Sequence, residues 1–253
     1  MANTSKNTSW GVVADWYSDY LKKEGSYQQQ VILPNLTRML ALKKSDSVLD
    51  LACGEGFFAR EFAKTGAKVI GADISAELIA KAKKAGGPII YKATAANKLR
   101  FAKDKEFSAV VCVLAIQNIE DIKGVFAEVS RVLVKGGRFL LVLNHPAFRI
   151  LKRSSWGFDE KENVQYRRID GYLSAAKISV DMHPGKKGAA KTTSFHRSLQ
   201  DFTKALSGAG FAITRLEEWT SHKVSGKGPR QKAEDTARKE IPLFMALEVR
   251  STI

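Results

Sequence analysis

The feature that most constrains this chain is the segment Val48–Arg60, in which an apolar run passes through one acid into two glycines and a helical pattern. The apolar residues around Asp50 predict a buried strand, and Gly54 and Gly56 predict a turn after it. Glycines let a ligand approach the backbone closely, and the N–H groups at a helix start attract electron-rich atoms. The segment therefore predicts a strand, turn and helix that bind a nucleotide or nucleoside.

Two cofactor classes fit this turn. Gly54-x-Gly56-x-x-Ala59 matches the dinucleotide fingerprint G-x-G-x-x-A, which is a weak signal by itself. In that fingerprint the first glycine follows the strand almost at once, whereas here Asp50 precedes it by four positions. With this acid in place, the segment resembles the first motif of class I S-adenosylmethionine-dependent methyltransferases.

The rest of the chain follows the order of elements in that family. A strand ending in an acid is followed by an apolar strand, a helical pattern, a Lys-Gly-Gly stop and another strand. These are Lys68–Ser75, Phe107–Ala115, Asp121–Val134, Lys135–Gly137 and Arg138–Leu143. The combined match, over roughly residues 46–148, resembles the family specifically, although no single element does.

The resemblance implies an α/β fold: a Rossmann-like seven-stranded sheet with a final antiparallel strand and helices on both faces. Leu199–Ala209 reads as a helix, and Phe211–Trp219 and Ile241–Val249 read as the strands that complete the sheet. The stretch from 144 to 199 is too long for a connection, so we expect a structured insertion after the fifth strand. Its residues 177–195 predict a hairpin-like ribbon.

We expect one methyltransferase domain over residues 1–253. The N-terminal segment is rich in aromatic and apolar residues, which predict helices that pack over the front of the cofactor pocket. The expected parts are an N-terminal helical lid (1–42), a cofactor-binding core (43–148), a substrate-cap insertion (149–199) and a C-terminal completion of the sheet (200–253).

The resemblance also implies a cofactor, S-adenosylmethionine, with S-adenosylhomocysteine as product. Asp73 takes the position of the acid that accepts hydrogen bonds from the ribose hydroxyls, and a carboxylate offers two oxygens to two adjacent donors. The same acid would serve a dinucleotide ribose equally well. Ala95 stands where the family usually has an acid for the adenine amino group, so cofactor binding is weakened unless backbone groups, Thr94 or Asn97 substitute. The expected cofactor-binding residues are Tyr17, Tyr27, Asp50, Ala52, Cys53, Gly54, Gly56, Phe57, Asp73, Ile74, Thr94, Ala95, Ala96, Leu114, Ala115 and Gln117.

Histidines are the candidate catalytic residues. Methyl transfer needs an aligned nucleophile and, for a hydroxyl or a protonated amine, removal of one proton. His145 follows the fifth core strand, where loops form the ligand crevice, and is the first candidate for that base, with His183 and His196 behind it. The alternative is that each only hydrogen-bonds to the backbone. We expect no metal, because the sequence has no Cys/His or Asp/His cluster with zinc spacing.

The expected methyl acceptor is an O, N or C nucleophile of a small molecule, held between the N-terminal helices and the insertion. Asn144–Ala147 shares only its first residue and one proline with the family's Asn/Asp-Pro-Pro-Tyr signature, which disfavours adenine or glutamine N-methylation. Three alternatives stay open: an RNA methyltransferase, an NAD-dependent oxidoreductase and a binder of the cofactor that catalyses nothing.

Charge and cysteine content bear on partners and location. The net charge of +15 is spread along the chain, so we expect weak, nonspecific RNA binding without RNA methylation. No apolar run is long enough to cross a membrane, and residues 1–10 lack the apolar core of a signal peptide. Cys53 and Cys112 read as apolar fillers in a reducing compartment. These features predict a cytoplasmic protein without a membrane partner; they do not predict an oligomeric state.

Overall fold

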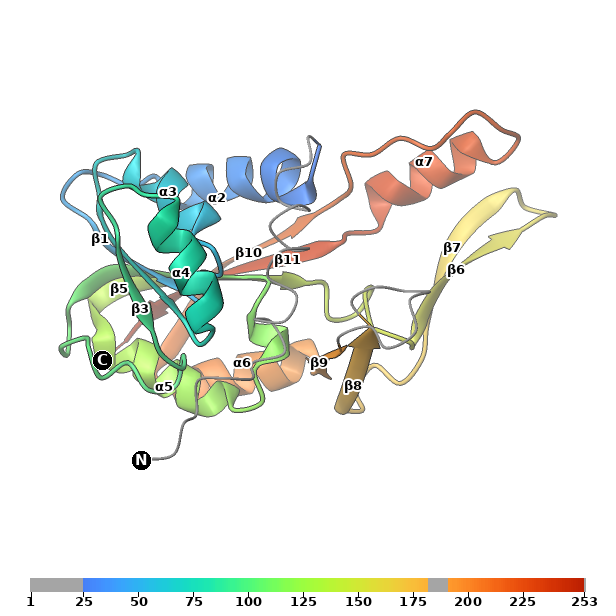
Figure 1. Cartoon of the computed structure of the whole chain (residues 1–253). Coiled ribbons are helices and arrows are strands. Elements are labelled where there is room, and N and C mark those ends of the chain that lie inside the picture. The colour runs from blue at the N-terminus through green and yellow to red at the C-terminus, as the bar shows by residue number, and fades with distance from the viewer. Residues whose placement is uncertain (1–24, 182–190, 253) are drawn as a thin grey trace.

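The computed structural model describes residues 25–181 and 191–252, which centre on one seven-stranded sheet (Figure 1). The strand order is β10-β11-β5-β4-β1-β2-β3. Strands β1 to β5 run parallel, and β11 runs antiparallel to both of its neighbours. The strands are β1 (Ser47–Leu51), β2 (Lys68–Asp73), β3 (Ile90–Ala93), β4 (Phe107–Val113), β5 (Leu133–Asn144), β10 (Phe211–Trp219) and β11 (Phe244–Ser251). The predicted fold class, with its final antiparallel strand, is confirmed.

Helices cover both faces of this sheet, because successive strand residues point to opposite faces. In β5, Phe139 and Leu141 pack with the helices α5 (Ile122–Val132) and α6 (Leu199–Gly208). Leu140 and Val142 belong to the other face, with η1 and the helices α2, α3 and α4. Figure 1 shows α5 and α6 on one side of the sheet and α2 and α3 on the other. The elements of the second face are η1 (Gln28–Ile32), α2 (Leu33–Leu40), α3 (Phe57–Ala63) and α4 (Ala76–Lys84).

Side-chain caps fix where the helices beside the sheet begin. Ser75 accepts a hydrogen bond from Leu78 N at the start of α4, and Asp121 accepts one from Gly124 N at the start of α5. Ser198 and Asp201 form a capping box on α6. Each cap satisfies backbone N–H groups that a helix start leaves unpaired. Helix α4 begins close after β2, and α5 follows β4 after a short 3₁₀ helix. Both helix starts lie at the same edge of the sheet as the turn after β1.

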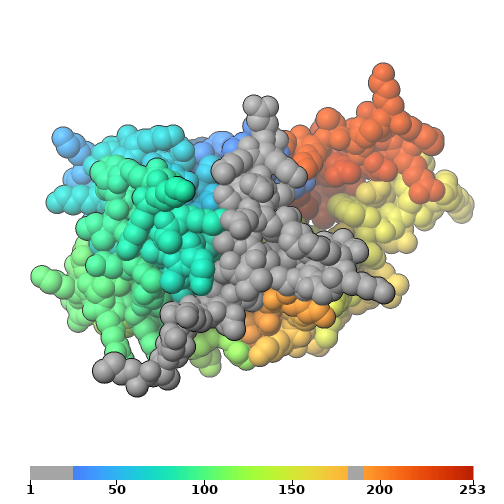
Figure 2. Space-filling view, viewed as in Figure 1, coloured from blue at the N-terminus to red at the C-terminus, as the bar shows by residue number. Residues whose placement is uncertain are grey.

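The expected insertion after β5 contains two antiparallel hairpins. The first pairs β6 (Ser154–Asp159) with β7 (Val164–Ile169). The second pairs β8 (Ala176–Asp181) with β9 (Lys191–His196) and confirms the predicted ribbon. Figures 1 and 2 show the first hairpin (yellow) projecting away from the main sheet beside the α7 region (red). The division of the chain into lid, core, cap and completion remains a prediction.

Helix α7 (Gln231–Glu240) was not predicted from the sequence, although it packs against β7. Its sequence is polar on almost every side, and Ala237 is its one buried residue. A helix without an apolar stripe gives no periodic signal. None of the helices in residues 25–181 and 191–252 combines the length and apolar character that a bilayer crossing requires.

The predicted boundary between the fifth helix and the fifth strand was wrong. Helix α5 ends at Val132, and β5 already begins at Leu133 and runs through Lys135–Gly137. Leu133 pairs with Phe107 across the sheet, after which the register shifts. Because of this irregular pairing, the Lys135–Gly137 segment is part of β5 and does not end the helix. Gly136 has a left-handed φ of 71° there.

Candidate active site

A cavity of about 400 Å³, the strand-end cavity, lies where β1, β2 and β4 end. Ligands of α/β sheets bind beyond the carboxyl ends of parallel strands, and this volume is in the range of about 300–1,000 Å³ typical of small-molecule sites. The predicted residues that line it are Asp50, Ala52, Cys53, Gly54, Phe57, Asp73, Ile74, Thr94, Ala95, Ala96, Leu114 and Ala115. Asn97, named from the sequence as a possible substitute for the missing acid, also lines it, as do residues that the predicted site omitted: Phe58, Leu78, Val113, Asn118, Ile119, Glu120 and Asp121.

The turn after β1 has three residues, at alternate positions, with left-handed backbone geometry. Ala52, Gly54 and Gly56 have φ values of 57°, 56° and 76°, all in the left-handed region. Ala52 and Gly54 line the strand-end cavity, whereas Gly56 is not among its lining residues. A Cβ at Gly56 would lie 2.3 Å from the Tyr91 hydroxyl oxygen. The second glycine is therefore required for packing against Tyr91, which differs from the ligand contact predicted for it.

Asp73 ties the turn to the end of β2. Its Oδ2 accepts a hydrogen bond from Gly54 N at 2.9 Å, and its Oδ1 accepts one from Ser75 N at 2.8 Å. Burial raises the pKa of this carboxyl, while the backbone N–H donors oppose the rise. Each carboxylate oxygen can accept more than one hydrogen bond, so Asp73 keeps acceptor capacity toward the cavity.

Asp50 is the most deeply buried acid of the site, with 1% of its surface exposed. Among the described residues, no donor reaches its Oδ2 atom. Burial raises the pKa of Asp50 to about 8, and the nearby negative charge of Asp73 adds to that rise. A buried oxygen without a partner is an unmet demand for a hydrogen-bond partner, and a cation placed beside it would favour the ionised carboxyl.

An acid does reach the region where Ala95 replaces the family's usual one. Asn97 Nδ2 donates to Asp121 Oδ2 at 2.8 Å, and both residues line the strand-end cavity. The pKa of Asp121 is lowered by that hydrogen bond and by the one from Gly124 N. In the sequence, Asp121 is recognisable only as a residue at the start of a helix. That position does not indicate that its side chain contacts Asn97 in the loop after β3.

The charge of the strand-end cavity is opposite in sign to that of the whole chain. Four acids line it, Asp50, Asp73, Glu120 and Asp121, and its described lining includes no lysine or arginine. A cavity lined by carboxylates attracts a cationic ligand and repels a pyrophosphate. This arrangement suits S-adenosylmethionine, whose sulfonium and ammonium groups outnumber its one carboxylate, better than a dinucleotide.

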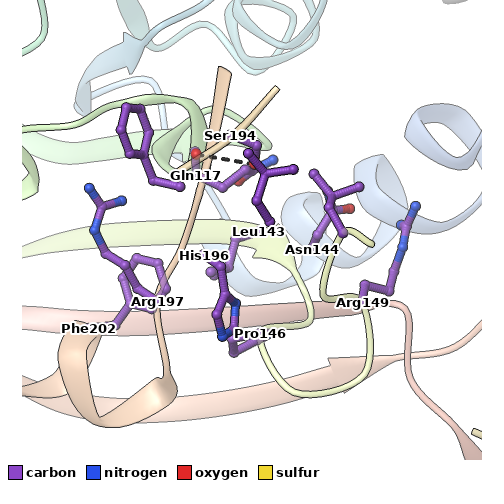
Figure 3. Close-up of a pocket in the computed structure, with 12 residues that line it drawn as sticks. Gln117, Leu143, Asn144, Pro146, Arg149, Ser194, His196, Arg197 and Phe202 are labelled. Carbon is purple, nitrogen blue, oxygen red and sulfur yellow. Dashed lines mark hydrogen bonds between the residues drawn. The ribbon is translucent and has the colours of Figure 1, made fainter. Parts of the chain in front are cut away.

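A second, small cavity of about 30 Å³ lies on the other side of η2 (Ile116–Asn118) (Figure 3). Gln117 was predicted to bind the cofactor but lines this small cavity, with its Nε2 donating to Leu114 O at 2.8 Å. Ser194 Oγ donates to Gln117 O at 3.4 Å and so joins β9 to η2. The lining residues are Gln117, Leu143, Asn144, Pro146, Arg149, Leu151, Ile178, Ser194, Phe195, His196, Arg197 and Phe202.

Of the three histidines predicted as bases, His196 lines the small cavity. Its Nε2 donates to Tyr172 O at 2.7 Å, so the neutral ring has its lone pair on Nδ1. His145 instead has both ring nitrogens engaged: Nδ1 accepts from Ala147 N and Phe148 N, and Nε2 donates to Glu218 Oε1 at 2.7 Å. Burial lowers the pKa of His145, and Glu218 opposes this. His145 is thus held by the chain and lines neither cavity, and its role as a base stays a prediction.

The described part of the N-terminal segment, from Gly25 onward, packs against the sheet and against the loop after β10. Tyr27 packs its ring edgewise against Phe244 and shares a hydrogen bond of 3.0 Å with Ser221 Oγ, away from the strand-end cavity. Elements η1 and α2 pack on the sheet face through Ile32 and Leu36. Tyr27 therefore does not line the strand-end cavity, and its contact with the cofactor stays a prediction. Tyr17 and His183 lie outside the described residues.

Comparison with known proteins identifies the family of the central sheet. Residues 49–141 match the family model described as "Methyltransferase domain". The chain is 43% identical over 184 residues to the ubiquinone/menaquinone biosynthesis C-methyltransferase of Desulfotalea psychrophila. The match covers 68% of this chain and 68% of that protein.

Two further relatives extend the similarity. The demethylmenaquinone methyltransferase of Tropheryma whipplei is 34% identical over 113 residues, which cover 43% of this chain and 46% of that protein. The match thus spans about half the length of that relative. The crystal structure of an S-adenosylmethionine-dependent methyltransferase from Mesorhizobium loti has a TM-score of 0.68 and 29% identity, and the match covers 86% of this chain and 96% of that one.

Proposed function

This chain belongs to the class I S-adenosylmethionine-dependent methyltransferases, and we propose that it transfers the methyl group of that cofactor to a small-molecule acceptor. The observation that carries the proposal is the strand-end cavity. It joins the glycine turn, the ribose-position acid Asp73 and the buried acid Asp50, whose Oδ2 has no partner, in a cavity lined by four acids and no described basic residue.

We propose that different residues of this cavity bind different parts of the cofactor. Asp73 accepts the ribose hydroxyls, and Ile74, which is 55% exposed, offers an apolar face to the adenine. Asn97 and Asp121 lie on the adenine side, in place of an acid at position 95. Asp50 and the turn at Gly54 receive the charged amino-acid end. The donor set and the local charge fit the cofactor.

The bound cofactor supplies an electrophilic methyl group on a positively charged sulfur. The contribution of the chain is to align an acceptor with that methyl group and to exclude water. We propose that the acceptor enters from the side of η2, because Asn118 lines the strand-end cavity and its neighbour Gln117 lines the small cavity. His196 is the histidine best placed to hold a proton there, through Nδ1.

The names of the relatives suggest which acceptor to test first. Two of them are named for methylation of demethylmenaquinone or for ubiquinone and menaquinone biosynthesis, which supports a ring carbon of a quinol as the first candidate. Weak, nonspecific RNA binding stays a prediction from the charge of +15. The cytoplasmic location also stays a prediction, and the free, buried thiols of Cys53 and Cys112 accord with it.

The test has a binding step and a transfer step. Calorimetry on the full chain is expected to detect S-adenosylmethionine and S-adenosylhomocysteine binding in preference to NAD. With demethylmenaquinol and S-adenosylmethionine, we expect equal amounts of methylated product and S-adenosylhomocysteine. Binding of NAD without S-adenosylhomocysteine would contradict the cofactor, and stoichiometric methylation of one RNA nucleotide would favour the RNA alternative. Cofactor binding without transfer to any metabolite or RNA fraction would indicate a binder that catalyses nothing.

A further inference from the structure

A third cavity, the arginine cavity, is lined by residues of β6, β7, α7 and the segments beside them. Figure 1 shows β6, β7 and α7 projecting together from the main sheet. Its volume is about 280 Å³, and it shares no lining residue with the strand-end cavity. It brings together segments that are far apart in the sequence. Its lining residues are Tyr27, Phe148, Arg149, Trp156, Arg167, Ser221, Arg238, Ile241, Pro242 and Leu243.

Three arginines line this cavity, and its described lining contains no aspartate or glutamate. All three, Arg149, Arg167 and Arg238, are partly buried. Arg149 holds its guanidinium 5.3 Å from the ring centre of Phe244. A partly buried guanidinium loses hydration, and a counter-charge normally compensates for that loss. For Arg167 and Arg238, no carboxylate of the described lining compensates for that loss.

The contacts of Arg167 and Arg238 are with neutral groups. Arg167 donates from Nε to Phe148 O at 2.8 Å and from Nη2 to Ser154 Oγ at 2.7 Å. Arg238 donates from Nε to Ser225 Oγ at 3.0 Å. Burial lowers the pKa of Arg167, and no acid opposes that shift. Nη1 of Arg167 and both terminal nitrogens of Arg238 thus keep donors that no described residue accepts.

Aromatic side chains form the rest of the wall. The guanidinium of Arg167 lies 5.0 Å from the ring centre of Trp156, which is 39% exposed. Phe148 and Tyr27 also line the cavity, and Tyr27 is held by its contacts with Phe244 and Ser221. Flat aromatic faces bind flat apolar groups, and arginine forks bind carboxylates and phosphates with two parallel hydrogen bonds.

We propose that the arginine cavity is a binding site for a small molecule that carries a phosphate or carboxylate on a flat, apolar body. The oxyanion is held by the terminal nitrogens of Arg167 and Arg238, and the apolar body lies against Trp156 and Phe148. The enclosure of these groups in a cavity, rather than along an open stripe, favours a small molecule over a nucleic-acid backbone.

The ligand has two possible sources. Arg149 lines both the arginine cavity and the small cavity behind η2, so the oxyanion can belong to the methyl acceptor itself. It can equally belong to a separate metabolite. The binding site does not depend on the proposed methyl transfer, because the strand-end cavity contributes none of its residues.

The test is a calorimetric titration of the full chain with 1-naphthyl phosphate, 1-naphthol and inorganic phosphate. We expect 1-naphthyl phosphate to bind at least tenfold more tightly than either of the others. Arg167→Gln and Arg238→Gln should each weaken its binding at least tenfold. Trp156→Leu should weaken 1-naphthyl phosphate binding and change inorganic phosphate binding less than twofold. Equal affinities for 1-naphthyl phosphate and 1-naphthol would overturn the proposal.

Arg168→Gln is the matched control, because it removes the same charge from the neighbouring position of β7. The Arg168 side chain is 68% exposed, pairs with Asp170 and does not line the cavity. We expect it to change 1-naphthyl phosphate affinity less than twofold, and a loss equal to that of Arg167→Gln would overturn the site in favour of general surface attraction. Arg167→Gln also removes two hydrogen bonds to the chain, so Arg238→Gln supplies an independent measurement if that variant unfolds.

S-adenosylhomocysteine binding and thermal unfolding, measured on every variant, separate this proposal from the proposed function. Loss of 1-naphthyl phosphate binding with intact S-adenosylhomocysteine binding assigns the effect to the arginine cavity. In transfer assays with an active acceptor, competition between 1-naphthyl phosphate and that acceptor would identify the oxyanion as the acceptor's own. Binding without competition would identify a separate ligand.

Discussion

The strand-end cavity and the arginine cavity carry opposite charges within one chain. The first has four acids and no described basic residue in its lining, and the second has three arginines and no described acid. The net charge of the chain, +15, predicts the charge of the arginine cavity but not that of the strand-end cavity, and it locates neither of them. We therefore expect each cavity to select its ligand by its local charge, whereas the net charge of the chain governs nonspecific attraction.

The two cavities also differ in how the chain builds them. The strand-end cavity uses the ends of buried parallel strands and short turns, where pairing fixes the backbone. The arginine cavity uses a hairpin, a polar helix and the loops beside β10 and β11. A change confined to one cavity should therefore leave the ligand affinity of the other unchanged, and the following variants test this.

The largest expected effect is that of Gly54→Val. Gly54 has a φ of 56° and lines the strand-end cavity beside Asp73, so a branched side chain is strained there and enters the cofactor's space. We expect S-adenosylhomocysteine affinity to fall at least 100-fold, while 1-naphthyl phosphate affinity stays within twofold. Calorimetry with both ligands checks this.

Gly86→Val is the control for backbone strain in that experiment. Gly86 has a φ of +79°, and an added Cβ there meets nothing within 4 Å. We expect it to lower the free energy of unfolding without changing S-adenosylhomocysteine affinity. If Gly54→Val folded with normal affinity, the turn would be structural and the cofactor would bind elsewhere.

Asp73→Ala should have the next largest effect. Loss of a charged acceptor costs about 1.5–3 kcal/mol of cofactor binding, which is roughly 10- to 150-fold in S-adenosylhomocysteine affinity. The side chain also holds Gly54 N and Ser75 N, so circular dichroism must show that the variant is folded. Asp170→Ala, an acid paired with the exposed Arg168, is the control. Unchanged affinity in folded Asp73→Ala would mean that other groups hold the ribose.

The sequence predicted most of the strand-end cavity and none of the arginine cavity, for physical reasons. Asp50, Gly54 and Asp73 lie within one strand-turn-helix-strand unit, so short-range patterns place them together. Asp121 was missed because its approach to Asn97 depends on how two loops pack. Helical spacing does not indicate which neighbour a helix end meets, so it could not place Tyr27 beside Phe244 and Ser221.

The arginine cavity was beyond sequence reasoning for a related reason. Arg167 and Arg238 come from a hairpin and a helix that carry no strong periodic signal, and only their packing brings them together. In the sequence each is one of 41 lysines and arginines, with no spacing that relates it to the other. The position of His145 after a strand predicted a base, but it could not indicate that both ring nitrogens have hydrogen-bond partners in the chain.

The charge of the strand-end cavity should appear as a pH dependence. The pKa of Asp50 is about 8 in the folded chain against 3.8 for an exposed carboxyl, so between these values the folded state binds the extra proton. The free energy of unfolding should therefore fall as pH rises through that range, by about 1.4 kcal/mol per pH unit from this group. Urea unfolding from pH 5 to 8 should show a flatter slope for Asp50→Asn. Equal slopes in both proteins would contradict the pKa.

Proton release on binding extends the same prediction to the cofactor. A cationic ligand beside Asp50 favours the ionised carboxyl, so S-adenosylmethionine binding at pH 7 should release protons. Calorimetry in buffers of different ionisation enthalpy measures that release. We expect a smaller release in Asp50→Asn and no change in the proton release that accompanies 1-naphthyl phosphate binding. A release that is the same in Asp50→Asn and in the wild type would place the cation away from this acid.

The smallest expected effect concerns strain in the turn. Ala52 has a φ of 57° in the strand-end cavity, and Ala41 has a φ of 41° at the end of α2, outside that cavity. A left-handed alanine costs about 1–2 kcal/mol, which the greater chain entropy of unfolded glycine partly offsets. We expect Ala41→Gly and Ala52→Gly each to raise the free energy of unfolding by about 0.5–1 kcal/mol in urea titrations. Only Ala52→Gly should weaken S-adenosylhomocysteine binding. Glycine makes the turn backbone at this position more flexible, so more conformational entropy is lost when the ligand binds. Equal S-adenosylhomocysteine affinities in the two variants would show that strain at Ala52 belongs to the fold alone and not to the preparation of the cofactor site.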